Sequence, residues 1–289
     1  MNAYTNQIIE CAKNINPWMY YISVIENGKL TTLSINPANK TNDCYSISKV
    51  FTVTALGLLY DDGKLDTAEK IVDIFKDELP DYMDPKWERV TVDMVIRHCW
   101  GITHGFLDID VEDIDSYQSI YGTRNDFLKI ILSHELGFEP GGKEVYSDAA
   151  YYLLSRVVTK KSGEILYEFL RKRLFNPLDF EETAWSCCPM GYTIGATGLY
   201  IRTGDMAKLG QLYISNGEYN GRRIISEEWC NTVLARGYEL RSFGSGYAKG
   251  GMYGQLLYID PSRNLVVAWV GHDRTDASAK MREFICDLS

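Results

Sequence analysis

The sequence predicts an α/β (α+β) fold: an antiparallel sheet flanked by helices, with an inserted all-helical domain. Strand-like runs gather near both ends of the 289-residue chain, and the patterns between them are mainly helical. Strands from the two ends can share one sheet while the intervening helices pack around a core of their own. We therefore expect residues 1–64 and 190–289 to form a sheet domain and residues 65–189 to form a helical domain.

The first strands are predicted on either side of Asn27-Gly28. Residues 4–14 have a helical pattern, and the run Trp18–Ile25 after them is rich in aromatic and β-branched residues. The run Lys29–Ile35 follows and is rich in Thr and Leu. Two such runs around an Asn-Gly pair indicate a β-hairpin.

The rest of the chain alternates between helical and strand-like patterns. An apolar helix is predicted from Ser46 to Tyr60, and prolines interrupt the helical stretch up to about residue 185. Two more strands are expected over Gly251–Ile259 and Asn264–Gly271. Further helices are predicted around Asp205–Asn216, Ser226–Ala235 and Ala277–Leu288.

Composition narrows the possible partners and compartment. Hydrophobic residues at 45% and a net charge of −9 fit a soluble globular protein and argue against a nucleic-acid partner. No window is apolar enough for a membrane span, and no secretory signal is visible, so we expect a cytoplasmic protein. A chain whose signal had been removed would look the same and would be extracytoplasmic. The seven cysteines are scattered, which is typical of reduced thiols.

No cofactor or metal is predicted. The run 108–115 holds five carboxylates, but it lacks the central glycine and terminal glutamate of a calcium loop. A solvated acidic face is the simpler interpretation. The composition does not indicate an oligomeric state.

The segment Ser46-Ile47-Ser48-Lys49 carries the first chemical signal. In a helix that begins near Ser46, Lys49 lies one turn away on the same face. The helix is otherwise apolar, so Lys49 should be buried, and burial favours the neutral amine, which can take a proton from a serine hydroxyl. A capping serine with a lysine that reaches solvent explains the same spacing equally well.

Two later motifs distinguish these interpretations. Tyr146-Ser147-Asp148 precedes an apolar helix, and Lys249-Gly250-Gly251 lies beside a predicted strand start. The order S-x-x-K, Tyr-x-Asp, Lys-x-Gly resembles the three-motif signature of the β-lactamase and penicillin-binding protein superfamily. The intervening segments 96–102, 175–180, 197–206 and 216–221 are similar to the turns of its class C branch, which includes esterases and D-amino-acid peptidases.

The resemblance implies a β-lactamase/transpeptidase-like fold with the active-site cleft between the two domains. It implies that Ser46 attacks a carbonyl while Lys49 and Tyr146 share the proton transfer. The backbone amides of Ser46 and Met252 would hold the oxyanion. Asp148, Lys249, Gly250 and Gly251 would line the cleft and bind a small-molecule or short-peptide substrate.

Two departures from the family pattern affect the expected activity. Asp148 stands where the branch has an amide that can donate to a substrate carbonyl, and Gly250 replaces the usual threonine. Asp148 could instead pair with Lys49 or Lys249. We expect a serine hydrolase acting on an ester, amide or β-lactam that bears a carboxylate. We do not expect efficient β-lactam hydrolysis. The alternative is a non-catalytic relative that binds a peptide or a peptidoglycan-like ligand.

Overall fold

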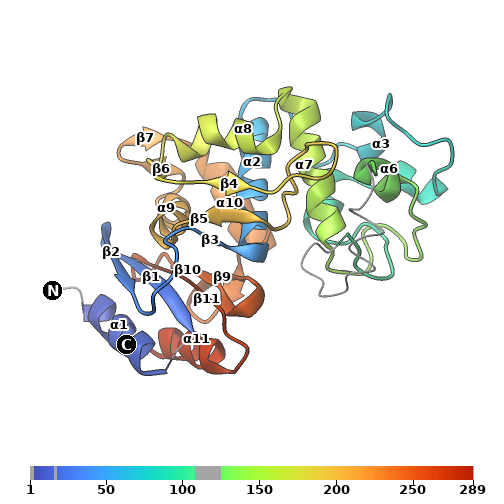
Figure 1. Cartoon of the computed structure of the whole chain (residues 1–289). Coiled ribbons are helices and arrows are strands. Elements are labelled where there is room, and N and C mark those ends of the chain that lie inside the picture. Colours follow the sequence, from blue (N-terminus) through green and yellow to red (C-terminus); the bar gives the residue numbers. More distant parts are fainter. Residues whose placement is uncertain (1–2, 16–17, 108–124, 289) are drawn as a thin grey trace. The chain divides into compact units, whose positions relative to one another are not determined.

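The computed structural model describes residues 3–15, 18–107 and 125–288, so the acidic run 108–115 lies outside the described residues. The chain forms two compact units (Figure 1). Unit 1 comprises Met1–Val50, Arg173–Ala184 and Leu199–Ser289, and unit 2 comprises Phe51–Lys172 and Trp185–Gly198. The division falls inside the helix that follows Ser46.

Unit 1 is built on a six-stranded antiparallel sheet to which both ends of the chain contribute. The N-terminal strand β1 lies beside the last strand β11, with Val24 opposite Val267. This arrangement confirms the predicted fold class, because strands far apart in the sequence form one sheet. In spatial order the strands are β2 (Lys29–Ser34), β1 (Met19–Glu26), β11 (Leu265–Gly271), β10 (Leu256–Asp260), β9 (Gly246–Gly250) and β8 (Arg241–Phe243).

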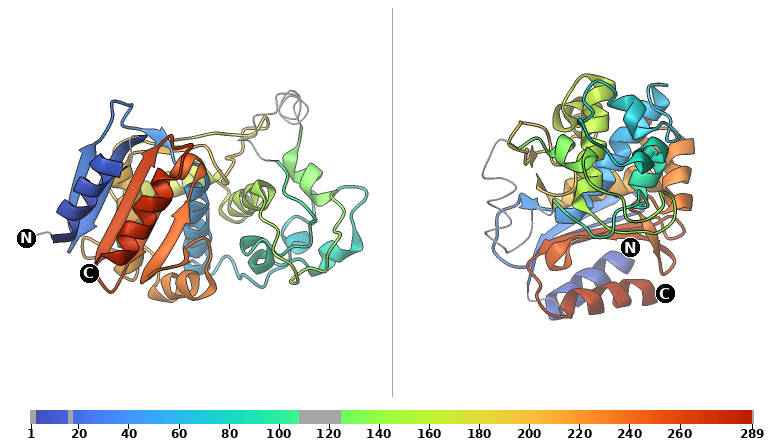
Figure 2. Two further views of the ribbon diagram at one scale, coloured as in Figure 1. Left: turned by 90° about the horizontal axis from the view of Figure 1, so that it is seen from below. Right: turned by 90° about the vertical axis from the view of Figure 1, so that its right-hand side faces the viewer.

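Helices cover both faces of this sheet. Helices α1 (Ala3–Ile15) and α11 (Ala277–Asp287) lie side by side on one face (Figure 2), where Ile8 and Met281 join the apolar cluster around Trp269. Burial of such side chains contributes roughly 1.5–3 kcal/mol each relative to exposure. The sheet is therefore held by apolar contacts on this side.

Helix α9 (Thr203–Ile214) covers the opposite face, and a glycine allows it to come close. A Cβ atom at Gly210 would lie 2.6 Å from Val266 and 2.9 Å from Ile259. Strands β10 and β11 are buried along their whole lengths because helices cover both faces. Their sequences accordingly read as continuous apolar runs rather than as alternating ones.

The remaining elements lie outside the six-stranded sheet. They are β3 (Asn42–Asp43), η1 (Tyr45–Ile47), η3 (Arg171–Phe175), β4 (Ala184–Trp185), β5 (Leu199–Ile201), β6 (Glu218–Tyr219), β7 (Arg222–Arg223), α10 (Glu227–Arg236) and η4 (Met252–Gly254).

Unit 2 is helical and packs around α7. Ser147 caps this helix by accepting a hydrogen bond from the amide of Ala149, and Gly163 ends it in a left-handed conformation. The hydroxyl of Tyr151 donates to the carbonyl of Ile96 at 3.1 Å, which ties α7 to α4. The helices of this part of the chain are α2 (Ser48–Asp61), α3 (Ile71–Ile74), η2 (Pro85–Arg89), α4 (Val92–Ile96), α6 (Phe127–Leu132), α7 (Asp148–Ser162) and α8 (Leu166–Leu170).

Candidate active site

Ser46 lies in η1, a single 3-10 turn that leads directly into α2. The amide of Ile47 donates to the carbonyl of Cys44 at 3.1 Å, and the amide of Cys44 donates to Leu199 on β5 at 2.9 Å. The α-helix itself begins at Ser48, two residues later than the sequence predicted. Ser46 is consequently held at the entrance of a buried helix and is itself only partly buried.

The residue before Ser46 has an unusual backbone conformation. Tyr45 has a φ of +48°, which a bulky side chain rarely adopts. Its amide donates to Asp43 Oδ1 at 2.8 Å, and its carbonyl accepts from the hydroxyl of Ser48. Such conformations persist where surrounding bonds hold them, and they concentrate at functional sites.

Lys49 approaches Ser46 from the protein interior. Its side chain is completely buried, and Nζ donates to Ser46 Oγ at 3.1 Å. The contact follows from the i,i+3 spacing, since the 3-10 turn and the first turn of α2 keep the two side chains on one side. A buried amine in hydrogen-bond contact with a partly exposed hydroxyl is an arrangement that suits proton abstraction.

Tyr146 and Asp148 belong to unit 2, at the start of α7. The ring of Tyr146 packs on His98, with centroids 4.6 Å apart, and the tyrosine stays 44% exposed. Asp148 is the first residue of the helix and is buried. A carboxylate there is favoured by the positive end of the helix dipole.

His98 fixes the turn that precedes α7. It is fully buried, and its Nδ1 accepts a hydrogen bond from the amide of Ser147 at 3.3 Å. Its carbonyl accepts from the amide of Val145 at 2.8 Å. His98 therefore holds the residues on both sides of Tyr146, Ser147 through its imidazole and Val145 through its backbone carbonyl.

Lys249 lies on β9 and forms an ion pair with Glu239. The carboxylate of Glu239 is almost completely buried, and the side chain of Lys249 is 12% exposed. The sequence suggested Asp148 as a partner of Lys249 and gave no indication of Glu239. No local pattern marks Glu239 as special, because it stands in an irregular segment after α10.

The two glycines after Lys249 make room for this chain's own atoms. A Cβ atom at Gly251 would lie 2.7 Å from the carbonyl oxygen of Cys44, so the end of β9 touches the turn that carries Ser46. A Cβ atom at Gly250 would lie 3.1 Å from the guanidinium of Arg282 on α11. Close packing thus requires Gly251, whereas the flexible end of Arg282 could make room for a side chain at position 250. The sequence had assigned both glycines only to the approach of a substrate.

The predicted strand Gly251–Ile259 was wrong at its first residues. The Lys-Gly-Gly motif ends β9 rather than opening a strand, and β10 begins at Leu256. Between them, Tyr253 and Gly254 have φ values of +56° and +80°, which break an extended strand. Met252 lies in this turn and is 39% exposed.

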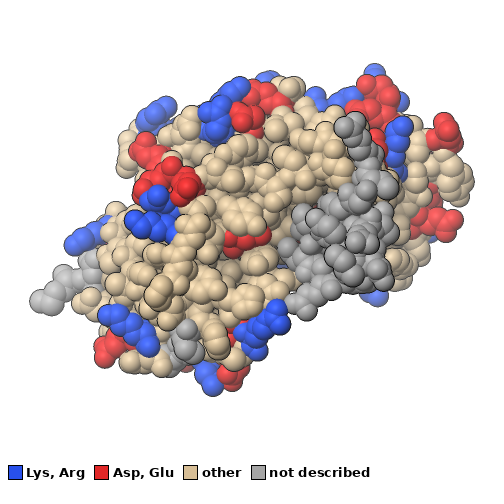
Figure 3. All heavy atoms as spheres, in the orientation of Figure 1, with Lys and Arg blue, Asp and Glu red and all other residues tan. Residues whose placement is uncertain are grey.

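Neither the charges on the face shown in Figure 3 nor the metal-ligand groups of the described residues indicate a second site. The face shown in Figure 3 carries Lys and Arg interspersed with Asp and Glu. Among the described residues, no group of three or more His, Cys, Asp or Glu side chains is arranged to hold a metal ion. No helix in the described part of the chain is long and apolar enough to cross a membrane.

Comparison with known proteins gives consistent matches. The Beta-lactamase family model matches residues 21–285. N-acetylmuramyl-L-alanine amidase of Bacillus subtilis (strain 168) is 29% identical over 78% of this chain and 66% of its own length. The 6-aminohexanoate-dimer hydrolase of Paenarthrobacter ureafaciens is 23% identical over 77% of this chain and 64% of its own length. The chain therefore spans about two thirds of the length of these relatives.

A solved structure confirms the fold. A penicillin-binding protein homolog from Caulobacter crescentus has a TM-score of 0.73 at 12% identity, over 98% of this chain and 97% of that one. Identity this low supports the fold alone.

Proposed function

The chain belongs to the Beta-lactamase family, and from this membership we propose that it is a serine hydrolase that forms an acyl-enzyme at Ser46. The observation that carries the proposal is the hydrogen bond from fully buried Lys49 to Ser46 Oγ. A buried lysine cannot neutralise charges on the surface, and its amine is within reach of the Ser46 hydroxyl proton. The amidase and hydrolase names of the relatives agree with this chemistry.

In the proposed reaction, the neutral amine of Lys49 takes the hydroxyl proton of Ser46 as Oγ bonds to the substrate carbonyl carbon. Collapse of the tetrahedral intermediate breaks the bond to the leaving group, which departs with the proton that Lys49 had taken. Water then attacks the acyl-enzyme and returns Ser46 to its free form. By match to the family motif, we propose that Tyr146 shares the proton transfer and that Asp148 contacts the substrate.

The amides of Ser46 and Met252 are proposed to hold the oxyanion. The contact between Gly251 and the Cys44 carbonyl supports this role, because it keeps the two segments that carry these amides close together. A donor of this kind typically contributes about 2.7–4 kcal/mol to transition-state stabilisation. A bulky residue at position 251 would force the two segments apart.

We propose an ester, amide or β-lactam substrate that bears a carboxylate. Lys249 supports this preference, although Glu239 offsets part of its charge. Arg282 adds a second cation beside Gly250: burial lowers the pKa of its guanidinium, and its Nε has no hydrogen-bond partner among the described residues. A poorly solvated cation gains from an incoming carboxylate.

Covalent labelling tests the proposed function. A fluorophosphonate should add one group to the protein, seen in the intact mass and mapped to the peptide that contains Ser46. Ser46→Ala should lose the adduct with little change in melting temperature. Ser34→Ala, at an exposed serine of β2, is the matched control and should label normally. Labelling that survives in Ser46→Ala contradicts the assignment, and a wild-type protein that never labels supports the non-catalytic binding alternative.

A further inference from the structure

Two tyrosines stand next to the residues assigned to the reaction. Tyr45 directly precedes Ser46, and Tyr253 directly follows Met252. Both have positive φ values, +48° and +56°, and both are partly exposed. Their rings touch edge to face, with centroids 5.4 Å apart. Two strained bulky residues in mutual contact on either side of the same site indicate a shared role.

Contacts with His272 and Arg274 hold the ring of Tyr253 in place. His272 stacks on it with centroids 4.0 Å apart, and Arg274 places its guanidinium 5.2 Å from the ring centroid. Arg274 Nη2 donates to the Tyr253 hydroxyl at 3.4 Å, and Arg274 Nε donates to His272 Nε2 at 3.2 Å. The backbone is held as well, because the amide of Asp273 donates to the Tyr253 carbonyl at 3.0 Å.

Asp273 in turn is tied to the start of α11. It accepts hydrogen bonds from the amide of Thr275 at 2.7 Å and from the amide of Ser278 at 2.6 Å. Tyr253 therefore rests on a turn that is bonded to a helix and is not a free loop side chain. Aromatic rings that are held in place before a ligand arrives lose little freedom on binding.

We propose that Tyr45 and Tyr253 form an aromatic wall that receives the acyl group of the substrate and favours flat aromatic acyl groups over saturated ones. This inference rests on the proposed function, because it takes Ser46 as the nucleophile. The aromatic wall belongs to unit 1 alone, as do Ser46 and Met252. A carbonyl held by the amides of Ser46 and Met252 would have the wall directly beside it.

The direction of the chain after β9 indicates that the aromatic wall contacts the acyl group of the substrate rather than its leaving group. An acyl group that extends along the end of β9 runs past Gly251 and Met252 toward Tyr253. An aromatic ring there can pack against the tyrosine rings in the edge or offset geometry that aromatic pairs prefer. The binding free energy that an aromatic pair gains beyond burial corresponds to about a two- to tenfold preference for an aromatic acyl group over a saturated one.

The test compares two esters with the same leaving group. p-Nitrophenyl phenylacetate and p-nitrophenyl cyclohexylacetate have similar bulk and differ in whether the ring is aromatic. Relative to their rates with hydroxide, the wild-type protein should favour the phenylacetate in kcat/KM by about two- to tenfold. Tyr253→Leu should reduce that preference toward one, and Tyr253→Phe should keep it.

Leucine at position 253 bears the same left-handed backbone strain as tyrosine. The change therefore removes the ring, together with its contacts to His272 and Arg274, without adding backbone strain. Tyr45→Leu is the second variant and should also reduce the preference. Tyr20→Leu is the control, at a half-buried tyrosine on β1, which β11 and β10 separate from β9.

A wild-type preference that persists in both leucine variants overturns the aromatic wall. Phenyl acetate and cyclohexyl acetate carry the aromatic or saturated ring in the leaving group instead. If the leucine variants change the aromatic preference only for this pair of esters, the assignment of the wall to the acyl side is overturned. Failure of Ser46 to label with a fluorophosphonate overturns the proposed function and this inference with it. Labelling of Ser46 combined with an unchanged acyl preference overturns the inference alone.

Discussion

At the scale of single residues, the assignment of Lys49 as the base can be tested by a change to a side chain of similar length that cannot give up its proton. Lys49→Arg places a guanidinium, which stays protonated, where an amine can lose its proton. We expect the rate of fluorophosphonate labelling to fall by about 10²- to 10⁴-fold. Lys40→Arg, at an exposed lysine of unit 1, is the control. A near-normal labelling rate in Lys49→Arg would mean that another group accepts the proton.

The ion pair between Lys249 and Glu239 makes a second prediction at this scale. Lys249→Met leaves the buried Glu239 carboxylate without this cation, and we expect the free energy of unfolding to fall by about 3–5 kcal/mol. Adding Glu239→Gln should recover part of the loss, because the charge that needs a partner is gone. Denaturant unfolding of the single and double variants measures the coupling.

The same double variant separates substrate binding from stability. If Lys249 contacts a substrate carboxylate, hydrolysis of an acid-bearing ester should fall about ten- to a hundredfold while an otherwise identical neutral ester changes little. Equal losses on both esters would assign Lys249 to the fold or to the proton network.

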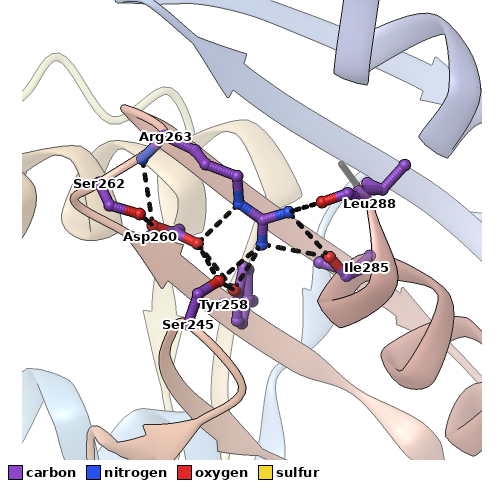
Figure 4. Close-up of polar contacts among 7 residues, drawn as sticks. All are labelled: Ser245, Tyr258, Asp260, Ser262, Arg263, Ile285 and Leu288. Atoms are coloured by element: carbon purple, nitrogen blue, oxygen red, sulfur yellow. Dashed lines mark hydrogen bonds and ion pairs between the residues drawn. The ribbon is translucent and has the colours of Figure 1, made fainter.

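At the scale of elements, a cluster around Arg263 joins the β10–β11 turn to the C-terminal helix (Figure 4). Arg263 Nε donates to Asp260 Oδ2 at 2.7 Å, and Nη1 donates to the carbonyls of Leu288 at 2.9 Å and Ile285 at 3.1 Å. The last carbonyls of a helix have no partner within the helix, and a cation there is favourable. We call this cluster the Arg263 clasp.

The charge of Asp260 makes the clasp sensitive to pH. Burial alone would raise the pKa of Asp260, but hydrogen bonds from Ser245, Ser262 and Arg263 outweigh it and hold the pKa well below its usual range. A carboxyl whose pKa is lower in the folded protein than in the unfolded chain raises the free energy of unfolding when the pH is above its unfolded pKa of about 3.9. This contribution is lost as the pH falls toward the pKa in the folded protein. The stabilisation is therefore present at neutral pH and is lost under acid conditions.

Arg263→Met should lower the free energy of unfolding by about 3–5 kcal/mol at pH 7, because it leaves Asp260 as an unpaired buried charge. The difference from the wild-type protein should shrink as the pH falls below the usual pKa range of a carboxyl, because Asp260 then becomes protonated in the folded protein and no longer needs the cation. Arg223→Met breaks an exposed pair with Glu218 and should cost about 1 kcal/mol or less. Thermal unfolding of the wild-type protein, Arg263→Met and Arg223→Met across a range of pH measures these effects. If the stability lost in Arg263→Met does not change with pH, the ion pair with Asp260 is not the source of that loss.

At the scale of the whole molecule, the cysteines report on folding. All seven are free thiols, and Cys187 is the exposed one. We expect a thiol reagent to modify Cys187 first in the native protein and all seven thiols after unfolding, with a melting temperature that is independent of reductant. Partial desolvation of the sulfur raises the pKa of Cys187 although the residue is exposed, so even this reaction should be slower than that of a small thiol in water. Cys187→Ser should remove the first phase.

The sequence by itself determined the features that depend on spacing along the chain. The i,i+3 separation of Ser46 and Lys49 predicted their contact, and the Asn27-Gly28 pair predicted the hairpin of β1 and β2. The three ordered motifs predicted the family and the fold class, which the comparisons confirm. These predictions hold because one helical turn or one tight turn has a fixed geometry that a few residues can specify.

Only the tertiary structure decided which distant residues meet. The partner of Lys249 is Glu239, which precedes it by ten positions in the sequence and lies before β8. The neighbour of Gly250 is Arg282 on the last helix. The contact between Tyr45 and Tyr253 joins residues more than 200 positions apart. Neither residue type nor spacing predicts such contacts, because they depend on how the sheet is ordered and on which helix covers it, and those are set by the packing of the whole core.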